Sequence, residues 1–225
     1  MRLAMFGVTG TCGRPLLAAA LSQGHVVRAL VRAPEKLGRT DPRLEVVKAD
    51  ASDADAVART VAEADTVVST LGGFRGPESL SGGTHNILEG MRRHEVRRLI
   101  LVQGIHLRFP QDHANLGQRM LGAIMTAVSR DIVIHGHLMA EELLDNGLDW
   151  TLIRIPRVTT GDPTGNHRLG TLRLGPWSHV TTGDVVSVAL QLASVSEWVR
   201  RTPMLASGRP IHSTRASYAA QQSFD

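Results

Sequence analysis

Short apolar runs alternate with longer stretches in which apolar residues recur every three or four positions. The runs cover residues 3–6, 25–31, 44–47, 66–71, 98–102 and 149–154. Near-continuous apolar runs of this length are typical of strands covered on both faces of a sheet. The longer stretches predict helices over residues 14–21, 53–61, 83–93, 116–128, 135–146 and 182–193. Because strands and helices alternate, we expect an α/β fold, a doubly wound parallel sheet with helices on both faces.

The alternation weakens in the last third of the chain. Residues 156–175 show little periodicity, and the last twenty residues are polar, which predicts a final strand and a frayed tail. The length of 225 residues suits one domain of this class. We therefore expect a single domain over residues 1–206 and a polar tail over 207–225. Within the domain, a small C-terminal substrate-covering region is expected, with its substrate-side elements mainly at 104–146 and 156–180.

The chain opens on a glycine-rich turn between the first apolar run and an alanine- and leucine-rich stretch. Its sequence is Gly7-Val8-Thr9-Gly10-Thr11-Cys12-Gly13. A strand, a glycine turn and a helix in succession are the sequence form of a nucleotide-binding turn, in which backbone N–H groups at the helix N-terminus face a pyrophosphate. An ordinary glycine-rich turn before a helix is the alternative. No Lys-Ser or Lys-Thr follows the last glycine, which excludes a P-loop.

Cys12 is the only cysteine, so an internal disulfide is excluded and a reducing, cytoplasmic location is expected. At a helix N-terminus a thiol pKa can be lowered. The simpler interpretation is a small residue that tolerates close cofactor contact. We also expect a protein that is not exported and has no membrane partner, because the chain has no run of eighteen apolar residues and no signal segment.

The net charge of +4 comes from an excess of arginine, which makes up 23 of the 25 basic residues. Such a balance raises the question of a nucleic-acid partner. However, the arginines are scattered, often in pairs such as Arg92-Arg93, and few aromatic residues are present to stack bases. A solvated surface without a nucleic-acid partner is the favoured interpretation.

In an open α/β sheet a ligand lies outside the carboxyl ends of the strands. The residue at the end of the second strand separates NAD from NADP, because an acidic residue there would hold the ribose 2′-hydroxyl. Here that position is Arg32, whose guanidinium suits a 2′-phosphate. Arg28 is a second candidate, although the pleat of the strand leaves a solvent-facing position equally open. NADP (as NADPH) is therefore favoured over NAD.

Four segments of the chain resemble the atypical short-chain dehydrogenase/reductases, in particular their NAD(P)-binding NmrA-like and flavin reductase/biliverdin-IXβ-reductase-like branch. They are the glycine loop at 7–13, the strand end at 30–32, the stretch at 49–53 and the motif at 140–156. The resemblance covers most of residues 1–206. It implies a Rossmann-type fold and a dinucleotide cofactor, but it is not specific for a substrate.

The loops at the strand ends, together with this resemblance, indicate sixteen cofactor contacts. They are Gly7, Thr9, Gly10, Thr11, Cys12, Gly13, Arg32, Asp50, Ala51, Leu71, Gly72, Gly73, Gln103, Gly104, Pro156 and Val158. By resemblance, the glycine loop would wrap the pyrophosphate, and Asp50 and Ala51 would meet the adenine. Residues 71–73 would pass under the ribose and nicotinamide, and residues 156–158 would meet the carboxamide.

The Tyr-x-x-x-Lys pair that the larger superfamily uses to reduce carbonyls is absent. Tyr218 is the only tyrosine, and the two lysines, Lys36 and Lys48, lie in the first fifty residues. Where many relatives carry a serine or threonine after the fifth strand, this chain has Gln103. Acid chemistry would therefore fall to histidine.

Two histidines are candidates for a general acid: His106, after the fifth strand, and His137, on a predicted helix. For both, polar lining or partly buried packing is the alternative. His135 and His137 also look like a metal fragment, but residues two apart on a helix face different directions, so no metal site is expected. Nearby apolar residues such as Leu138 and Met139 would line an apolar pocket, or else belong to the core or a dimer surface.

Three functions remain open at this point. The leading hypothesis is an NADPH-dependent reductase of a small conjugated acceptor, a flavin, quinone or enone, since these acceptors need no strong protein acid. The alternatives are an NADP(H)-binding sensor or regulatory protein without turnover, and a redox-neutral isomerase or epimerase. The expected partner is a small-molecule substrate, and the expected assembly is a monomer or homodimer.

Overall fold

The structure is a computed structural model that describes residues 1–38, 40–72, 78–107, 109, 112, 130–175 and 177–208. Its main sheet has eight strands in the order β3-β2-β1-β4-β5-β6-β10-β8, and β7 pairs with β9 in a second, two-stranded sheet. The strands are β1 (Arg2–Phe6), β2 (Val26–Val31), β3 (Leu44–Lys48), β4 (Thr66–Ser69), β5 (Arg98–Gly104), β6 (Asp149–Ile155), β7 (Arg157–Thr159), β8 (His167–Gly170), β9 (His179–Thr181) and β10 (Met204–Ser207). All neighbours in the main sheet are parallel except β10 and β8. The predicted doubly wound α/β fold is confirmed.

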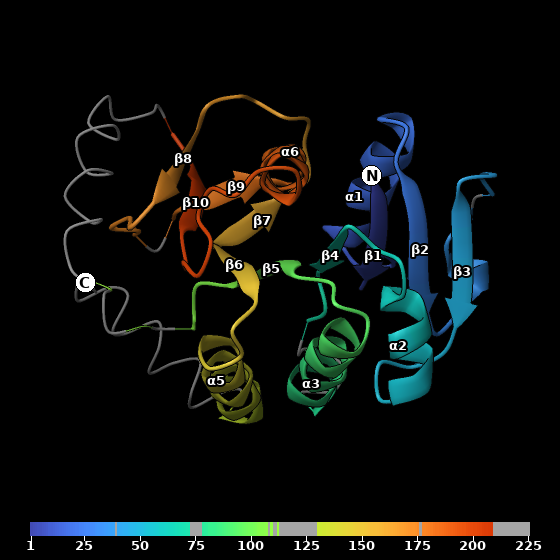
Figure 1. Ribbon diagram of the computed structural model, residues 1–225. Helices are drawn as coiled ribbons and strands as arrows, with labels where there is room; N and C mark the ends of the chain where they lie inside the picture. The colour runs from blue at the N-terminus through green and yellow to red at the C-terminus, as the bar shows by residue number, and fades with distance from the viewer. Residues whose placement is uncertain are drawn as a thin grey trace.

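Helices cover both faces of the main sheet. They are α1 (Gly13–Ser22), α2 (Ala54–Val61), α3 (Glu78–Arg93), α5 (Arg130–Leu144) and α6 (Thr182–Ala193), and a short 3-10 helix η1 (Pro34–Lys36) follows β2. Figure 1 shows α1 and α6 on one face and α2, α3 and α5 on the other. Each layer has its own apolar core, one between the sheet and α1 and α6, the other under α2, α3 and α5. In the described part of the chain, no helix is long and apolar enough to cross a membrane.

The order of the strands places the expected ligand crevice. β1 lies between β2 and β4, so the chain crosses the sheet in opposite directions on the two sides of β1. At such a switch point the loops after β1 and β4 diverge and leave a crevice at the carboxyl ends of the strands. The glycine loop follows β1, which places it at this crevice.

Two helices begin earlier than predicted. α3 starts at Glu78 and α5 at Arg130, against predictions of 83 and 135. In α3 the glycines argued for a late start, because glycine is a poor helix former. A Cβ on Gly83 would lie 3.0 Å from Ala51 and 3.2 Å from Leu71, so close packing explains the glycine inside the helix. The predicted helix at 116–128 lies outside the described residues.

Residues 156–175 contain two short strands, β7 and β8, that the weak periodicity did not predict. β8 is an antiparallel edge strand that pairs with β10, and β7 pairs with β9 in the small sheet. Strands this short carry too few residues for a periodic signal. The end of the predicted tail, from residue 209, is outside the described part.

Asp184, in the first turn of α6, is a buried carboxylate that organises the connection between β7 and β8. It accepts hydrogen bonds from the backbone N–H of Thr164 (2.9 Å) and Gly165 (3.2 Å) and from the Thr164 hydroxyl (2.7 Å). Burial alone would raise the pKa of Asp184, but these hydrogen bonds and that with Thr181 outweigh it and hold the pKa below its ordinary value. The carboxylate form therefore stabilises the fold.

Replacing Asp184 with asparagine is expected to lower the free energy of unfolding by about 1–3 kcal/mol at pH 7, because an amide cannot accept all of these hydrogen bonds. A lowered folded pKa gives stability that is present above the unfolded pKa, about 3.9, and is lost as the pH falls through the folded value. The difference in the free energy of unfolding between the wild type and the Asp184→Asn variant should therefore become smaller at acidic pH. Urea unfolding at pH 7 and pH 3 measures it, with Asp162→Asn on the exposed neighbouring loop as control.

Candidate functional site

The glycine loop is shaped by close backbone approaches that leave no room for side chains. Gly7 has a φ of +77°, and a Cβ there would lie 2.6 Å from the carbonyl carbon of Thr70. A Cβ on Gly13 would lie 2.1 Å from the Gly7 carbonyl oxygen, and one on Gly10 would lie 3.3 Å from the same atom. The N–H of Gly10 donates to that oxygen at 3.0 Å. The backbone of the loop therefore requires glycine at positions 7 and 13 and leaves little room for a side chain at position 10.

Thr70, directly after β4, supports the loop and was not identified from the sequence. Its hydroxyl lies 3.1 Å from the Phe6 carbonyl oxygen and 3.2 Å from that of Gly7, and its backbone N–H donates to Phe6. The contact ties the end of β4 to the end of β1. A hydroxyl at the end of an apolar run was the available signal, but its partner depends on which strands are neighbours.

Cys12 precedes α1 as its N-cap residue and makes no capping hydrogen bond with its side chain. Burial raises the pKa of the Cys12 thiol. The suggestion of a lowered thiol pKa is therefore wrong, because removal from water disfavours the thiolate at this position. The interpretation as a small residue within the loop remains.

Arg32 follows β2 and holds an exposed guanidinium at the crevice edge, with 61% of its side chain accessible. The nearest carboxylate is Asp50, 3.5 Å away. The pKa of Asp50 lies below its ordinary value, mainly because the Ser52 backbone N–H donates to the carboxylate, with a smaller contribution from Arg32. An exposed ion pair of this kind is weak, so Arg32 is free to meet another anion.

Arg28 is not available to a cofactor. Its guanidinium donates to Glu45 at 2.7 Å and to the backbone carbonyls of Arg59 and Ala62, at the C-terminal end of α2. Carbonyl groups at the end of a helix have no partner within the helix, and Arg28 is placed to donate hydrogen bonds to two of them. The prediction that Arg28 could assist Arg32 is corrected by these contacts.

Ala51 lies buried beside Asp50 and is fixed by α3. The Asn86 side chain donates to the Ala51 carbonyl oxygen at 2.8 Å, and Gly83 packs against the Ala51 side chain. Asn86 was not identified from the sequence, because nothing local connects it with residue 51. The predicted adenine position is thus held rigidly against α3.

Gln103, at the end of β5, occupies the place where relatives carry a hydroxyl. Its side chain is buried, and its amide donates to the Leu71 carbonyl oxygen at 2.7 Å. The residue therefore fixes the loop after β4, part of which was predicted to pass under the ribose. A Cβ on Gly72 would meet no atom within 4 Å, and Gly73 lies outside the described residues.

His106 folds back over Gly104 in the turn after β5. A Cβ on Gly104 would lie 2.5 Å from the His106 Nδ1, and one on Gly136 of α5 would lie 3.9 Å from its Nε2. The Nε2 atom is buried and has no hydrogen-bond partner among the described residues. Burial lowers the pKa of His106, and the nearby His137 lowers it further. His137 itself is exposed on α5, and the acid role of both residues stays a prediction.

The neighbouring residues on α5 have structural partners. His135 is paired with the Ser81 hydroxyl of α3 at 2.7 Å, and Met139 is fully buried in the core under α3 and α5. Leu138 is exposed, so of the two apolar candidates only Leu138 borders a cavity. Among the residues that the structure describes, no group of three His, Cys, Asp or Glu side chains is arranged to hold a metal ion.

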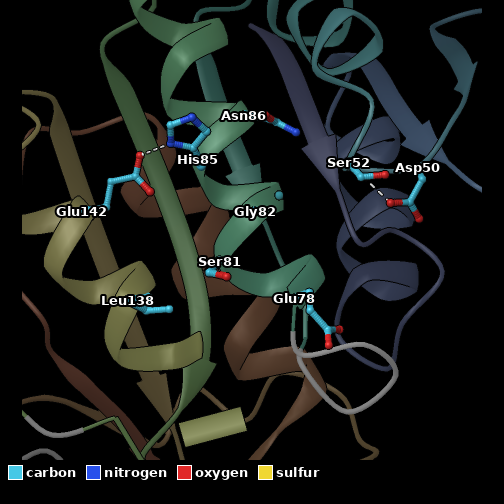
Figure 2. A pocket seen from close by; sticks show the side chains of 10 residues that line it. Asp50, Ser52, Glu78, Ser81, Gly82, His85, Asn86, Leu138 and Glu142 are labelled. Carbon is cyan, nitrogen blue, oxygen red and sulfur yellow. Dashed lines mark hydrogen bonds and ion pairs between the residues drawn. The ribbon is translucent and has the colours of Figure 1, made fainter. Parts of the chain in front are cut away.

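A cavity of about 510 Å³ lies between the loop after β3, α3 and α5. Figure 2 shows Asp50 and Ser52 at one end and the His85–Glu142 ion pair, 2.7 Å long, at the other. Glu78 adds a third carboxylate to the lining. A cavity with three carboxylates disfavours phosphate groups, so of the predicted cofactor only the adenine, near Asp50, suits it.

Pro156 and Val158 lie where β6 passes into β7. Pro156 is buried, and Val158 is half-buried and pairs with Val180 of β9. The Ile155 carbonyl oxygen accepts from the Ile105 N–H at 3.0 Å, so this segment lies beside the turn that carries His106. The predicted carboxamide contacts therefore share one end of the sheet with residues 103–106.

The described residues fit a dinucleotide. The loop at the crevice leaves no room for a Cβ on Gly7 or Gly13, it leads directly into the N-terminus of α1, and it contains no acidic residue that would oppose a phosphate. The exposed guanidinium of Arg32, in a weak ion pair with Asp50, stands at the end of β2. The arrangement is consistent with the predicted anion site at the glycine loop and with a separate predicted adenine position at residues 50–51.

The comparisons with known proteins agree with this site. Residues 7–194 match a family described as NAD(P)H-binding. The chloroplastic protein At2g34460 of Arabidopsis thaliana is 27% identical over 172 residues, covering 71% of the chain and 60% of that protein. A 3-diazoavenalumate denitrifying reductase of a Streptomyces species is 35% identical over 114 residues, covering 44% of the chain and 36% of the reductase. The chain thus spans less than two thirds of either relative.

A solved structure has the same fold over the whole chain. The oxidoreductase ylbE of Lactococcus lactis superposes with a TM-score of 0.78 at 19% identity, covering 100% of this chain and 99% of the other. The family match begins at the glycine loop and spans β2 to β9 and α6. The chain therefore belongs to the NAD(P)H-binding family of atypical short-chain dehydrogenase/reductases, whose members include NAD(P)-dependent oxidoreductases.

Proposed function

We propose that this protein is an NADPH-dependent reductase of a small conjugated acceptor, such as a flavin, a quinone or an enone. One observation carries the proposal: the glycine loop has the close backbone packing of a nucleotide-binding turn, while the chain lacks a Tyr-x-x-x-Lys pair to protonate a simple carbonyl. A conjugated acceptor delocalises the charge that develops on reduction, so it needs no strong protein acid. The reductase name of the Streptomyces relative supports the reaction class.

Each part of the crevice would have a defined task. The backbone N–H groups of residues 7–13 would hold the pyrophosphate, Arg32 the 2′-phosphate, and Asp50 and Ala51 the adenine. When bound, the reduced dinucleotide supplies a hydride to the acceptor. Residues 103–106 and 156–158 would border its nicotinamide end.

His106 suits hydrogen bonding better than proton donation at neutral pH. Because burial and His137 lower its pKa, the uncharged imidazole is favoured at pH 7. An uncharged ring can still donate one N–H to an acceptor atom. We therefore assign His106 a positioning role: its Nε2 is buried and not open to an acceptor, and its ring packs over Gly104 in the turn after β5.

Exchanging Arg32 for glutamine is expected to weaken NADPH binding at least about tenfold and to leave NADH binding unchanged, because only NADPH carries the 2′-phosphate that a guanidinium binds. Dissociation constants of both cofactors measure the effect. Arg59→Gln removes an exposed charge on α2 and serves as the matched control. An unchanged NADPH affinity in the Arg32 variant would contradict the assignment of NADP.

Steady-state NADPH oxidation against a panel of flavins, quinones and enones tests the proposed reaction. We expect turnover on at least one class of acceptor. Tight NADPH binding without turnover on any acceptor would instead indicate a sensor or regulatory protein. Product formation without net loss of NADPH would indicate an isomerase or epimerase.

A further inference from the structure

Residues 156–180 have an excess of positive charge at the carboxyl end of β6. They contain three arginines, Arg157, Arg168 and Arg173, but a single acidic residue, Asp162. Arg157 and Arg173 are exposed, and no described residue forms an ion pair or hydrogen bond with either guanidinium.

Arginines elsewhere in the described chain are mostly paired. Arg28, Arg43 and Arg97 each lie within 3.2 Å of a carboxylate oxygen. Two exposed and unpaired guanidinium groups in one short segment are therefore a local feature of this region. Guanidinium groups bind carboxylate and phosphate groups through charge-assisted hydrogen bonds.

The segment that carries Arg173 packs against the turn after β5. Leu174 is fully buried with Met204 and Ala206, and Leu172 and Ile105 pack against the same cluster. Ile105 stands between Gly104 and His106. Arg173 thus belongs to a segment anchored beside the predicted nicotinamide end of the crevice.

The register of the small sheet brings a tryptophan to the same end. Arg157 pairs with His179, so Trp177 lies two residues before the partner of Arg157. Figure 1 shows β7 and β9 side by side next to α6. Trp177 is 86% exposed, whereas Trp150 is 2% exposed in the core. The exposed indole of Trp177 has apolar surface that a ligand could cover, and its flat face allows a planar ring to stack on it.

We propose that Arg157, Arg173 and Trp177 form the acceptor-binding surface of this protein and select a planar acceptor that carries a carboxylate or phosphate group. The inference rests on the proposed reductase function and narrows its substrate class. The arginines bind the anionic group, Trp177 stacks on the conjugated ring, and the anchoring of Leu174 keeps the surface beside the crevice.

Flavin mononucleotide and riboflavin test this selection, because they share one ring system and differ by a phosphate. Dissociation constants are measured by equilibrium dialysis on the protein saturated with NADP⁺. We expect flavin mononucleotide to bind at least about tenfold more tightly than riboflavin. In the Arg157→Gln/Arg173→Gln double variant the two affinities should become equal. Trp177→Ala should weaken both flavins about tenfold, and Trp177→Phe should weaken them less.

The Arg59→Gln variant removes an exposed charge from α2 and should retain the wild-type preference for flavin mononucleotide over riboflavin. Equal binding of the two flavins by the wild type, no binding of either, or a preference that survives in the double variant would overturn the inference. The NADPH oxidation assay separates this result from the proposed function. Selective binding without turnover contradicts the reductase alone, and turnover without selectivity contradicts the acceptor surface alone.

Discussion

Replacing Gly13 with alanine is expected to weaken NADPH binding at least about a hundredfold, since the N–H groups of the loop would lose their alignment toward the pyrophosphate. The new Cβ would lie 2.1 Å from the Gly7 carbonyl oxygen and 2.8 Å from the Val8 Cα. Both are backbone atoms, so relief requires α1 to move away from β1. Overpacking of this kind should also lower the free energy of unfolding by about 3 kcal/mol. Cofactor titration and urea unfolding measure the two effects.

Gly82 offers the matched control for stability. It lies inside α3, and a Cβ there would meet no atom within 4 Å. Gly82→Ala should therefore raise the free energy of unfolding by about 0.5–1 kcal/mol, because alanine is the better helix former. A Gly13 variant that binds NADPH as the wild type does would show that the close approach of α1 and β1 does not shape the cofactor site.

Exchanging Arg154 for methionine is expected to lower the free energy of unfolding by about 3–5 kcal/mol, because it leaves the Asp112 carboxylate buried without its partner. Arg154 on β6 is 1% exposed and Asp112 6%. The guanidinium donates to both Asp112 oxygens, at 2.5 and 2.7 Å, and to the backbone carbonyls of Leu107 and Thr202. It also lies over the Phe109 ring, 5.0 Å from its centre.

Two further variants separate the lost pairing from lost packing. Arg154→Met/Asp112→Leu should recover much of the stability, since a buried ion pair replaced by apolar residues is often neutral. Arg97→Met breaks an exposed pair with Asp149 and should cost less than about 1 kcal/mol. Urea unfolding of these proteins and of Asp112→Leu alone completes the double-mutant cycle and gives the coupling energy between Arg154 and Asp112. If Arg154→Met cost no more than Arg97→Met, the buried pair would not anchor Leu107 and Asp112 to β6.

The contrast between Asp53 and Arg28 shows which features a sequence can predict. Asp53 was expected to open the helix at 53–61, and its carboxylate accepts from the Ala56 N–H as the N-cap of α2. That contact spans three residues, so the local pattern contains both partners. Arg28 caps the other end of the same helix from β2, more than thirty residues away. No local pattern connects these positions, and the sequence therefore left Arg28 open as a cofactor contact.

The residues of the candidate site show the same distinction between local and long-range contacts. The glycine loop and Arg32 were identified because a turn, a strand end and a helix start are adjacent in the chain. Thr70 and Asn86 were missed, although both fix the crevice, because each bonds to a backbone carbonyl at least 35 residues away. Cys12 shows a third case: a helix N-terminus can lower a thiol pKa, but burial raises the pKa of Cys12, and the sequence does not show how deeply a residue is buried.

The sequence by itself determined the alternation of strands and helices, the nucleotide-binding turn and the missing Tyr-x-x-x-Lys pair. Each of these features depends on residue types at short spacings along the chain. Such spacings determine backbone conformation through periodicity and steric restrictions. Only the tertiary structure decided the partners of buried polar groups such as Arg154 and Asp184, and the packing of residues 172–174 against the turn after β5. Those depend on which strands become neighbours and how much water is excluded between them, and neither property belongs to any short stretch of the chain.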